Sequence, residues 1–536
     1  MSGTPRTRRR ETRRWSWRTL GIALVAVGAT ALTGCTGADS GSSAGKQLRY
    51  GYDLSAQFTN TFDPAKSTGD CDQIVTHFIF DSLLRRDENT GEPIPGLAKS
   101  WDVSGDEKRS ITFHLRDDVQ FSDGTKLDAA AVKASLLHNK KNSQLTTLTT
   151  HMDSVDVVDP LTVRVNLKDD QSTPFLYVMG LSRDGMIESP KALNDLDKHP
   201  VGSGPFMLDS FTPGEGIALV KNPKYWDKAK YDFSGIHFLQ AAVGPPGVAS
   251  FKAGDLDLVR FEAESLPTLR KDSSATVVTK KTEAFLRLEF RLGFSDGRTT
   301  PFANPLVRQA VLFAIDRKKI NDIVQLGEGE VATQALPKGS PGYNASLVDL
   351  YPFNPTHAKE LLAQAGYPNG FSFSMAIPGP GIQSMQSMGE LIQNMLKDVG
   401  ITANIKPIAG NDIATNYYIN GAGEAFSAAQ LASSFYPGAY YDEFGKFQYV
   451  PTFNHSENQE VTDLTLRAQA AKTPEEVGQL VQQAAKVVMD GAMEAPIAFM
   501  PQFLAVAKNR VGGTVSGQRN ICDPPDLSEV RMKTSG

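Results

Sequence analysis

The sequence predicts a mixed α/β protein that folds into more than one domain. Its 536 residues are too many for one ordinary hydrophobic core. Segments with the two-residue period of a half-buried strand alternate along the chain with segments of helical period. The content of 40% hydrophobic and 21% charged residues is typical of a folded globular protein and not of a disordered or multi-spanning one.

Strand patterns are clear in the first half of the chain. In residues 161–167, leucine and valine alternate with threonine, arginine and asparagine, and residues 111–115 have the same period. Asp159-Pro160 provides a turn between the strand at 161–167 and the preceding segment at 154–158.

Helix starts are clearest in the second half. Asn304 and Asn354 each precede a proline, the pattern of an N-cap followed by the first helical residue, and Gly366 fits the end of the second helix. Residues 473–476, Thr-Pro-Glu-Glu, form a capping box. Apolar residues follow each start at helical spacing, and we interpret these faces as core and not as cofactor sites.

Residues 1–34 have the features of an export signal. Seven arginines precede an apolar stretch at 20–32, which is too short to span a bilayer as a permanent helix. The run Leu-Thr-Gly-Cys at 32–35 resembles the bacterial lipobox, in which the cysteine is acylated and becomes the new N-terminus. We therefore expect a lipid on Cys35, a flexible tether at 35–45 and anchorage to the outer face of the cell membrane.

Two alternatives stay open at this end of the chain. The segment could be an ordinary signal peptide with an incidental cysteine. The pair Arg13-Arg14 leaves open export by a twin-arginine route, although the residues after it match that signal poorly.

The charge of the remaining chain argues against nucleic-acid binding. Beyond residue 34 the sequence has 48 basic and 59 acidic side chains, a net charge of −11. So acidic a surface has nothing to offset repulsion from phosphates.

Two cysteines remain after the tether, Cys71 and Cys522. Outside the membrane, two is the number expected for one disulfide, which would join an early segment to the C-terminal tail. The alternative is two buried free thiols.

No motif for a common catalytic chemistry stands out in the sequence. No two of the eight histidines lie three or four residues apart, and neither H-E-x-x-H nor G-x-S-x-G occurs. The glycine-containing run at 41–47 is one residue short of a phosphate loop and lacks its final serine or threonine. We expect no enzyme activity, no metal and no cofactor.

Several segments, in order along the chain, resemble the extracellular solute-binding proteins of family 5, which serve peptide and nickel ABC importers. They include PGLAKSW at 95–101, residues 112–132, residues 201–226, residues 251–257 and residues 304–316, with further matches at 354–366 and 399–405. One departure is Ala131, where the family motif has an acid. The resemblance covers most of residues 46–530.

This resemblance implies a two-lobed, periplasmic-binding-protein-like clamp with an extra inserted domain. By the order of the motifs, lobe one comprises residues 46–80, 205–290 and 498–536, the inserted domain residues 81–204, and lobe two residues 291–497. A Cys71–Cys522 disulfide would lie within lobe one.

The implied function is capture of a small solute by hinge closure and its delivery to ABC permease subunits and their ATPases. The protein would act as a monomer that binds a peptide or another small molecule and no nucleic acid. A regulatory or sensory lipoprotein that keeps the fold without transport is the alternative.

Two charged anchors that hold peptide termini in the family are missing. No acid occurs between Glu424 and Asp442, and no arginine or lysine occurs between Lys359 and Lys397. The resemblance therefore implies an uncharged solute, a blocked or longer peptide or a polyol, although Asp442 could replace the lost acid. The residues expected to contact the ligand are Phe58, Thr59, Asn60 and Phe285 in lobe one, and Gln383, Ser433, Ser434, Phe435, Tyr436 and Tyr440 in lobe two.

Overall fold

The computed structural model describes residues 47–533, with gaps at 68–69, 88–91, 105–108, 144–147, 169–171, 182, 228–229, 341, 379–382, 409–416, 418–420, 422, 432–457, 472 and 517–521. These residues belong to one compact unit, Ser43–Gly536. Among the helices of the described ranges, none is long and apolar enough to cross a membrane.

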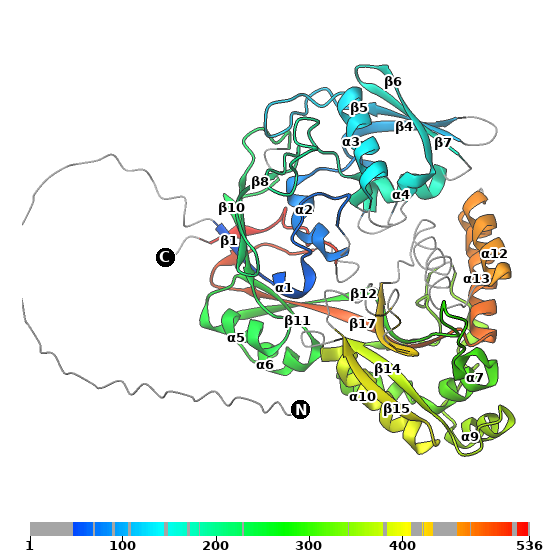
Figure 1. The fold of residues 1–536 in the computed structure, drawn as a ribbon. Helices are drawn as coiled ribbons and strands as arrows, with labels where there is room; N and C mark the ends of the chain where they lie inside the picture. Colours follow the sequence, from blue (N-terminus) through cyan, green and yellow to red (C-terminus); the bar gives the residue numbers. More distant parts are fainter. Residues whose placement is uncertain are drawn as a thin grey trace, which may run out of the picture. The chain divides into compact units, whose positions relative to one another are not determined.

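The largest sheet has eleven strands and runs through most of this unit (Figure 1). Its order is β15-β14-β16-β12-β17-β11-β1-β10-β9-β8, and β13 pairs with β17 outside this path. The strands are β1 (Gln47–Tyr52), β8 (Phe206–Thr212), β9 (Gly216–Lys221), β10 (Gly235–Gln240), β11 (Leu258–Phe261), β12 (Ala275–Phe290), β13 (Glu330–Val331), β14 (Ser372–Pro378), β15 (Thr402–Ile408), β16 (Ala425–Leu431) and β17 (Glu494–Ala507).

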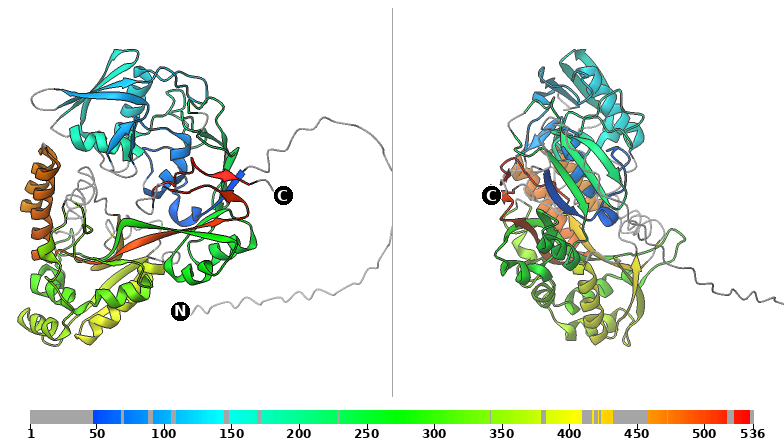
Figure 2. Two further views of the ribbon diagram at one scale, coloured as in Figure 1. Left: turned by 180° about the vertical axis from the view of Figure 1, so that it is seen from behind. Right: turned by 90° about the vertical axis from the view of Figure 1, so that its left-hand side faces the viewer.

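Two long strands, β12 and β17, connect the halves of this sheet and lie side by side in the views of Figures 1 and 2. In the first half, Ala275–Lys281 of β12 pairs with β17, which also pairs with β11. In the second half, Phe285–Glu289 pairs with β17, and Ala284–Phe290 pairs with β16. The regular pairing of β12 with β17 is interrupted between Lys281 and Phe285.

Helices cover both faces of the first half. Because side chains alternate along β17, Phe503 and Ala505 pack with α5 and α6, whereas Leu504 and Val506 belong to a second core that also includes Leu54 of α1. The helices here are α1 (Leu54–Gln57), α2 (Gln73–Ile79), α5 (Pro245–Ala253) and α6 (Leu266–Arg270).

The second half has its own large apolar core, built on β12, β14 and the helices around them. These helices are α7 (Pro305–Ala314), α8 (Arg317–Val324), α9 (Pro355–Gln364), α10 (Gln383–Asp398), α12 (Gln459–Ala470) and α13 (Pro474–Asp490).

A separate four-stranded sheet follows α2 in the chain and has a further core. Its antiparallel strands are β4 (Ala98–Ser104), β5 (Ser110–Leu115), β7 (Thr162–Leu167) and β6 (Met152–Asp159), in that order, with α3 (Ala129–Asn142) and α4 (Ser172–Leu181). The remaining short elements are β2 (Leu84–Arg86), β3 (Pro93–Pro95), β18 (Val511–Gly512), β19 (Arg531–Met532) and the 3₁₀ helices η2 (Asp70–Asp72), η3 (Leu148–His151), η4 (Arg183–Gly185), η5 (Ala263–Ser265), η6 (Pro301–Ala303) and η7 (Ala345–Leu347). The boundaries predicted between the lobes and the inserted domain remain a proposal.

The locally encoded elements agree with the sequence predictions. Asn304 and Asn354 are the N-caps of α7 and α9, and the Thr473 side chain accepts a hydrogen bond from the Glu476 N–H at the start of α13. Gly366, just beyond α9, has a φ of 90°, a conformation that glycine adopts without strain. The strands predicted around 111–115 and 161–167 correspond to β5 and β7.

In the structure, Cys71 and Cys522 form a disulfide. Both cysteines lie in the core that α2 and β1 share with the C-terminal residues. Next to the bridge, an ion pair of 2.8 Å joins Arg86 Nη2 to Asp523 Oδ2.

Candidate functional site

The carboxyl ends of three parallel strands form an edge in the first half of the sheet. β1 is parallel to both β10 and β11, so the residues that follow these strands emerge on the same side. We call the ends of β1, β10 and β11 the first carboxyl edge. In open α/β sheets, ligands bind in the crevice outside such edges.

The loop that leaves β1 is held in place by polar contacts. Asp53 is buried, and its Oδ1 accepts hydrogen bonds of 2.9 Å from Gln240 Nε2 and from the Ser55 hydroxyl. Gln240 is the last residue of β10, so these bonds tie two strand ends together.

The second half of the sheet has a corresponding second carboxyl edge. β14 is parallel to β15 and to β16, and α10 begins five residues after the last residue of β14. The residues immediately after β14, β15 and β16 lie outside the described ranges.

Hydrogen bonds connect the two edges. Glu262, the residue after β11, accepts a bond of 2.8 Å from the Ser384 N–H and one of 3.1 Å from the Ser384 hydroxyl, in the first turn of α10. Burial raises the pKa of the Glu262 carboxyl, and the two bonds from Ser384 partly oppose this effect. The first and second carboxyl edges therefore lie next to each other, and the space outside them is our candidate binding site.

Thr59, Asn60 and Gln383, three of the predicted ligand contacts, lie in loops or helices at these edges. Thr59 binds Asp72 twice, through its N–H at 2.7 Å and through its hydroxyl. Asn60 is exposed with a φ of 60°, and exposed Gln383 donates a bond of 3.1 Å to Ser387. Their role in ligand contact stays a prediction.

The two predicted phenylalanines are packed inside the protein. Phe58 is 3% exposed and lies against Phe62 and Phe211. Phe285 is fully buried against Phe499 on the neighbouring strand. Their packing is accounted for by these neighbours, and contact with a ligand stays a prediction. The other five, Ser433, Ser434, Phe435, Tyr436 and Tyr440, lie outside the described residues.

Sequence reasoning missed Glu262 and Gln502. The position of Glu262 at the candidate site could not be predicted, because nothing in the sequence shows that β11 ends beside α10. Gln502 had a readable signal, since it is the only amide side chain in the apolar run 494–507. Its side chain is 4% exposed, and neither Nε2 nor Oε1 has a hydrogen-bond partner.

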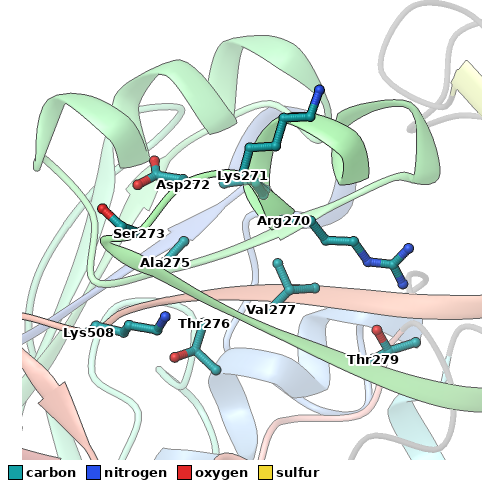
Figure 3. A pocket seen from close by; sticks show the side chains of 10 residues that line it. Arg270, Lys271, Asp272, Ser273, Ala275, Thr276, Val277, Thr279 and Lys508 are labelled. Carbon is teal, nitrogen blue, oxygen red and sulfur yellow. The ribbon is translucent and has the colours of Figure 1, made fainter.

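A pocket of about 410 Å³ lies between α6 and β12 (Figure 3). It is an open hollow lined by Arg270, Lys271, Thr279, Lys508 and their neighbours, and it includes none of the predicted ligand contacts. Within the described part of the chain, no group of three or more histidine, cysteine or acidic side chains could hold a metal ion.

The chain belongs to the bacterial extracellular solute-binding proteins, family 5. The sequence profile described as "Bacterial extracellular solute-binding proteins, family 5 Middle" matches residues 92–449, more than half of the chain. It is a family of binding proteins and not of enzymes, as the sequence predicted. The fold is accordingly the two-lobed α/β clamp expected from the motifs.

Individual relatives bind different ligands. The chain is 27% identical over 486 residues to the glutathione-binding protein GsiB of Escherichia coli O1:K1 / APEC, covering 86% of this chain and 90% of that protein. A dipeptide-binding protein from Pseudoalteromonas sp. SM9913 in complex with Met-Leu has a TM-score of 0.78 at 22% identity, covering 91% of this chain and 100% of that one. NikA from Staphylococcus aureus, in complex with Ni(L-His)2, has a TM-score of 0.76 at 19% identity, covering 89% and 98%. These two structures support the fold alone.

Proposed function

We propose that this protein captures a small, uncharged or peptide-like solute between its two carboxyl edges and delivers it to the permease of an ABC importer. The observation that carries the proposal is the pair of hydrogen bonds from Ser384 to Glu262, which brings the ends of two parallel strand sets together. A solute placed there would contact both lobes at once, as a clamp requires.

Hinge closure about β12 and β17 is the mechanism that fits this arrangement. These strands connect the two halves, and their pairing is irregular between Lys281 and Phe285. Such an interruption removes ladder hydrogen bonds and makes bending easier there than in a regular ladder. A solute that binds the closed form more tightly than the open form shifts the population toward closure.

The missing charges argue for an uncharged solute. A zwitterionic dipeptide in a closed, dry cleft needs a partner for each terminus, and an unpaired buried charge costs several kcal/mol. Residues 425–441 contain no acid and residues 360–396 no arginine or lysine. Blocked or longer peptides and polyols avoid this cost.

Attachment to the outer face of the cell membrane through an acylated Cys35 completes the proposal. Two acyl chains give stable anchorage where one does not. In the native host, metabolic labelling with radioactive palmitate should mark the wild-type protein, and Cys35→Ser should abolish the label and release the protein into the medium or periplasm. Equal labelling of both proteins would contradict acylation at Cys35.

Mass spectrometry of small molecules that co-purify with the protein tests solute capture. We expect one dominant uncharged or peptide-like compound, released on unfolding, whose re-addition reduces the radius of gyration measured by X-ray scattering. A scattering profile that no co-purified or added compound changes would contradict the clamp. If the purified protein binds the solute but deletion of its gene leaves cellular uptake of that solute normal, the regulatory alternative would be favoured.

A further inference from the structure

Gln502 has a side chain that the protein leaves unsatisfied. It is 4% exposed, and neither its Nε2 nor its Oε1 has a hydrogen-bond partner. Burying an amide without hydrogen bonds costs about 1–3 kcal/mol in proteins. Methionine would fill similar space without that cost. A polar group kept at such a cost points to a partner that binds from outside the chain.

The position of Gln502 places it at the candidate site. On β17 it pairs with Lys280, next to the point where the regular pairing of β12 and β17 is interrupted. Because side chains alternate along a strand, Gln502 shares a face with Leu504. Leu504 lies in the core that also holds Leu54 and Phe58, which follow the carboxyl end of β1. The lining of the pocket in Figure 3, beside α6, includes neither Gln502 nor Lys280.

The strand register also brings Gln502 next to the contact between the two edges. Phe261 is paired with Phe503, so one step along the antiparallel ladder leads from Phe261 to Glu262 and from Phe503 to Gln502. Glu262 is the residue that binds Ser384 of α10. A solute bonded to Gln502 would therefore lie where the first carboxyl edge meets the second.

We propose that Gln502 is a specificity-determining residue whose side-chain amide forms paired hydrogen bonds with an amide group of the solute. A carboxamide offers N–H donors and a C=O acceptor side by side, and a peptide or carboxamide group offers the complementary set. A carboxylate could use only the donors and an ammonium only the acceptor, so either would leave part of the buried amide unpaired. This inference rests on the proposed function and narrows its substrate class to compounds that present an uncharged amide group to Gln502, such as blocked peptides or longer peptides bound through an internal peptide group.

Gln502→Met separates a ligand role from a structural one. In the mature protein, freed of bound solute by unfolding and refolding, we expect its melting temperature to equal or exceed that of the wild type, because the variant buries no unpaired amide. Titration calorimetry would use N-acetylated dipeptide amides as probes, with the matching zwitterionic dipeptides and myo-inositol for comparison. We expect the acetylated amides to bind the wild type, and Gln502→Met to weaken them by about 10-fold to 100-fold, the value of one or two hydrogen bonds.

The matched control is Gln364→Met at the exposed end of α9, which should change neither melting temperature nor affinity. A drop of several degrees in the melting temperature of Gln502→Met would show that the amide serves the fold, for example through a bound water, and would overturn the inference. Equal affinity of Gln502→Met and wild type for the acetylated amides would also overturn the inference, but it would leave the proposed capture of a solute unaffected. Binding of myo-inositol alone would overturn the amide class. Failure of the wild type to bind or co-purify with any small molecule would instead contradict the proposed function.

Discussion

Glu188 shows at the scale of one residue how burial controls protonation. Its side chain is fully buried, and this burial raises the pKa of the carboxyl from 4.5 to about 8. The Ser135 hydroxyl binds Oε2, while Oε1 has no hydrogen-bond partner. His138 lowers the pKa of this carboxyl, whereas Asp63, which is paired with His138 at 3.1 Å, raises it. The folded protein therefore holds Glu188 protonated at neutral pH.

Replacing Glu188 with glutamine should stabilise the protein increasingly as pH rises. Below the unfolded pKa, both states carry the proton and the raised folded pKa has no cost. Between pH 4.5 and about 8 only the unfolded state ionises, so wild-type stability falls. We expect the stability of Glu188→Gln relative to wild type to increase by up to about 4 kcal/mol over this range. Urea unfolding at pH 5 and pH 8 measures this difference, with exposed Glu390→Gln as the control; a difference that does not depend on pH would contradict it.

At the scale of secondary-structure elements, a disulfide and a shared apolar core hold the start of α2 against the C-terminal segment. The disulfide joins η2, at the start of α2, to a C-terminal segment 451 residues away. Val511, Leu527 and Val530 of that segment lie in the same core as Ile74 and Phe78 of α2. Closing so long a loop in the unfolded chain gives an upper limit of about 6 kcal/mol in a chain-entropy model.

The double variant Cys71→Ser/Cys522→Ser should unfold at a lower urea concentration than the oxidised wild type. We expect a loss of about 2–5 kcal/mol, because removing a native disulfide usually costs less than the entropic limit. A reducing agent should bring the wild type close to the variant and leave the variant unchanged. Identical urea midpoints for the oxidised wild type and the variant would contradict this prediction and would show that the packing of the C-terminal segment alone maintains the stability.

The sequence predicted individual helices and strands better than it predicted which strands pair with each other. The N-caps of α7, α9 and α13 depend on neighbouring residues, so they could be read locally. The pairing of β17 with β11 and β12 depends on residues more than 200 positions apart, and no local pattern encodes it. Without that pairing, Gln502 is simply an amide in an apolar strand, and Glu262 an acid after one. The family motifs supplied the two-lobed fold because they describe the scaffold, but they say little about the ligand.

At the scale of the whole molecule, polar contacts among the described residues join the loops and helices of the first half of the sheet to those of the second half. Glu262 and Ser384 form one at the carboxyl edges, where the serine is buried and the glutamate is partly exposed. Arg270 of α6 and Glu328, which follows α8, form another at 2.6 Å, but the arginine side chain is 50% exposed. Because solvent screens such a pair, it contributes little to the free energy of closure. Of these two contacts, the less exposed Glu262–Ser384 link should therefore have the greater influence on the balance between open and closed forms.

Removing the Glu262 carboxylate should shift the solute-free protein toward the open form. Glu262→Ala eliminates both bonds to Ser384, and bonds to a charged group are worth about 1.5–3 kcal/mol each, so the closed population should fall by about tenfold or more. Solute affinity should fall by the same factor, since closure then has to be driven by the solute alone. X-ray scattering should show a larger radius of gyration for the solute-free variant but the same value as wild type when both are saturated. Glu390→Gln, exposed on α10, is the control, and a Glu262→Ala variant whose scattering and affinity equal those of wild type would show that this link does not hold the lobes together.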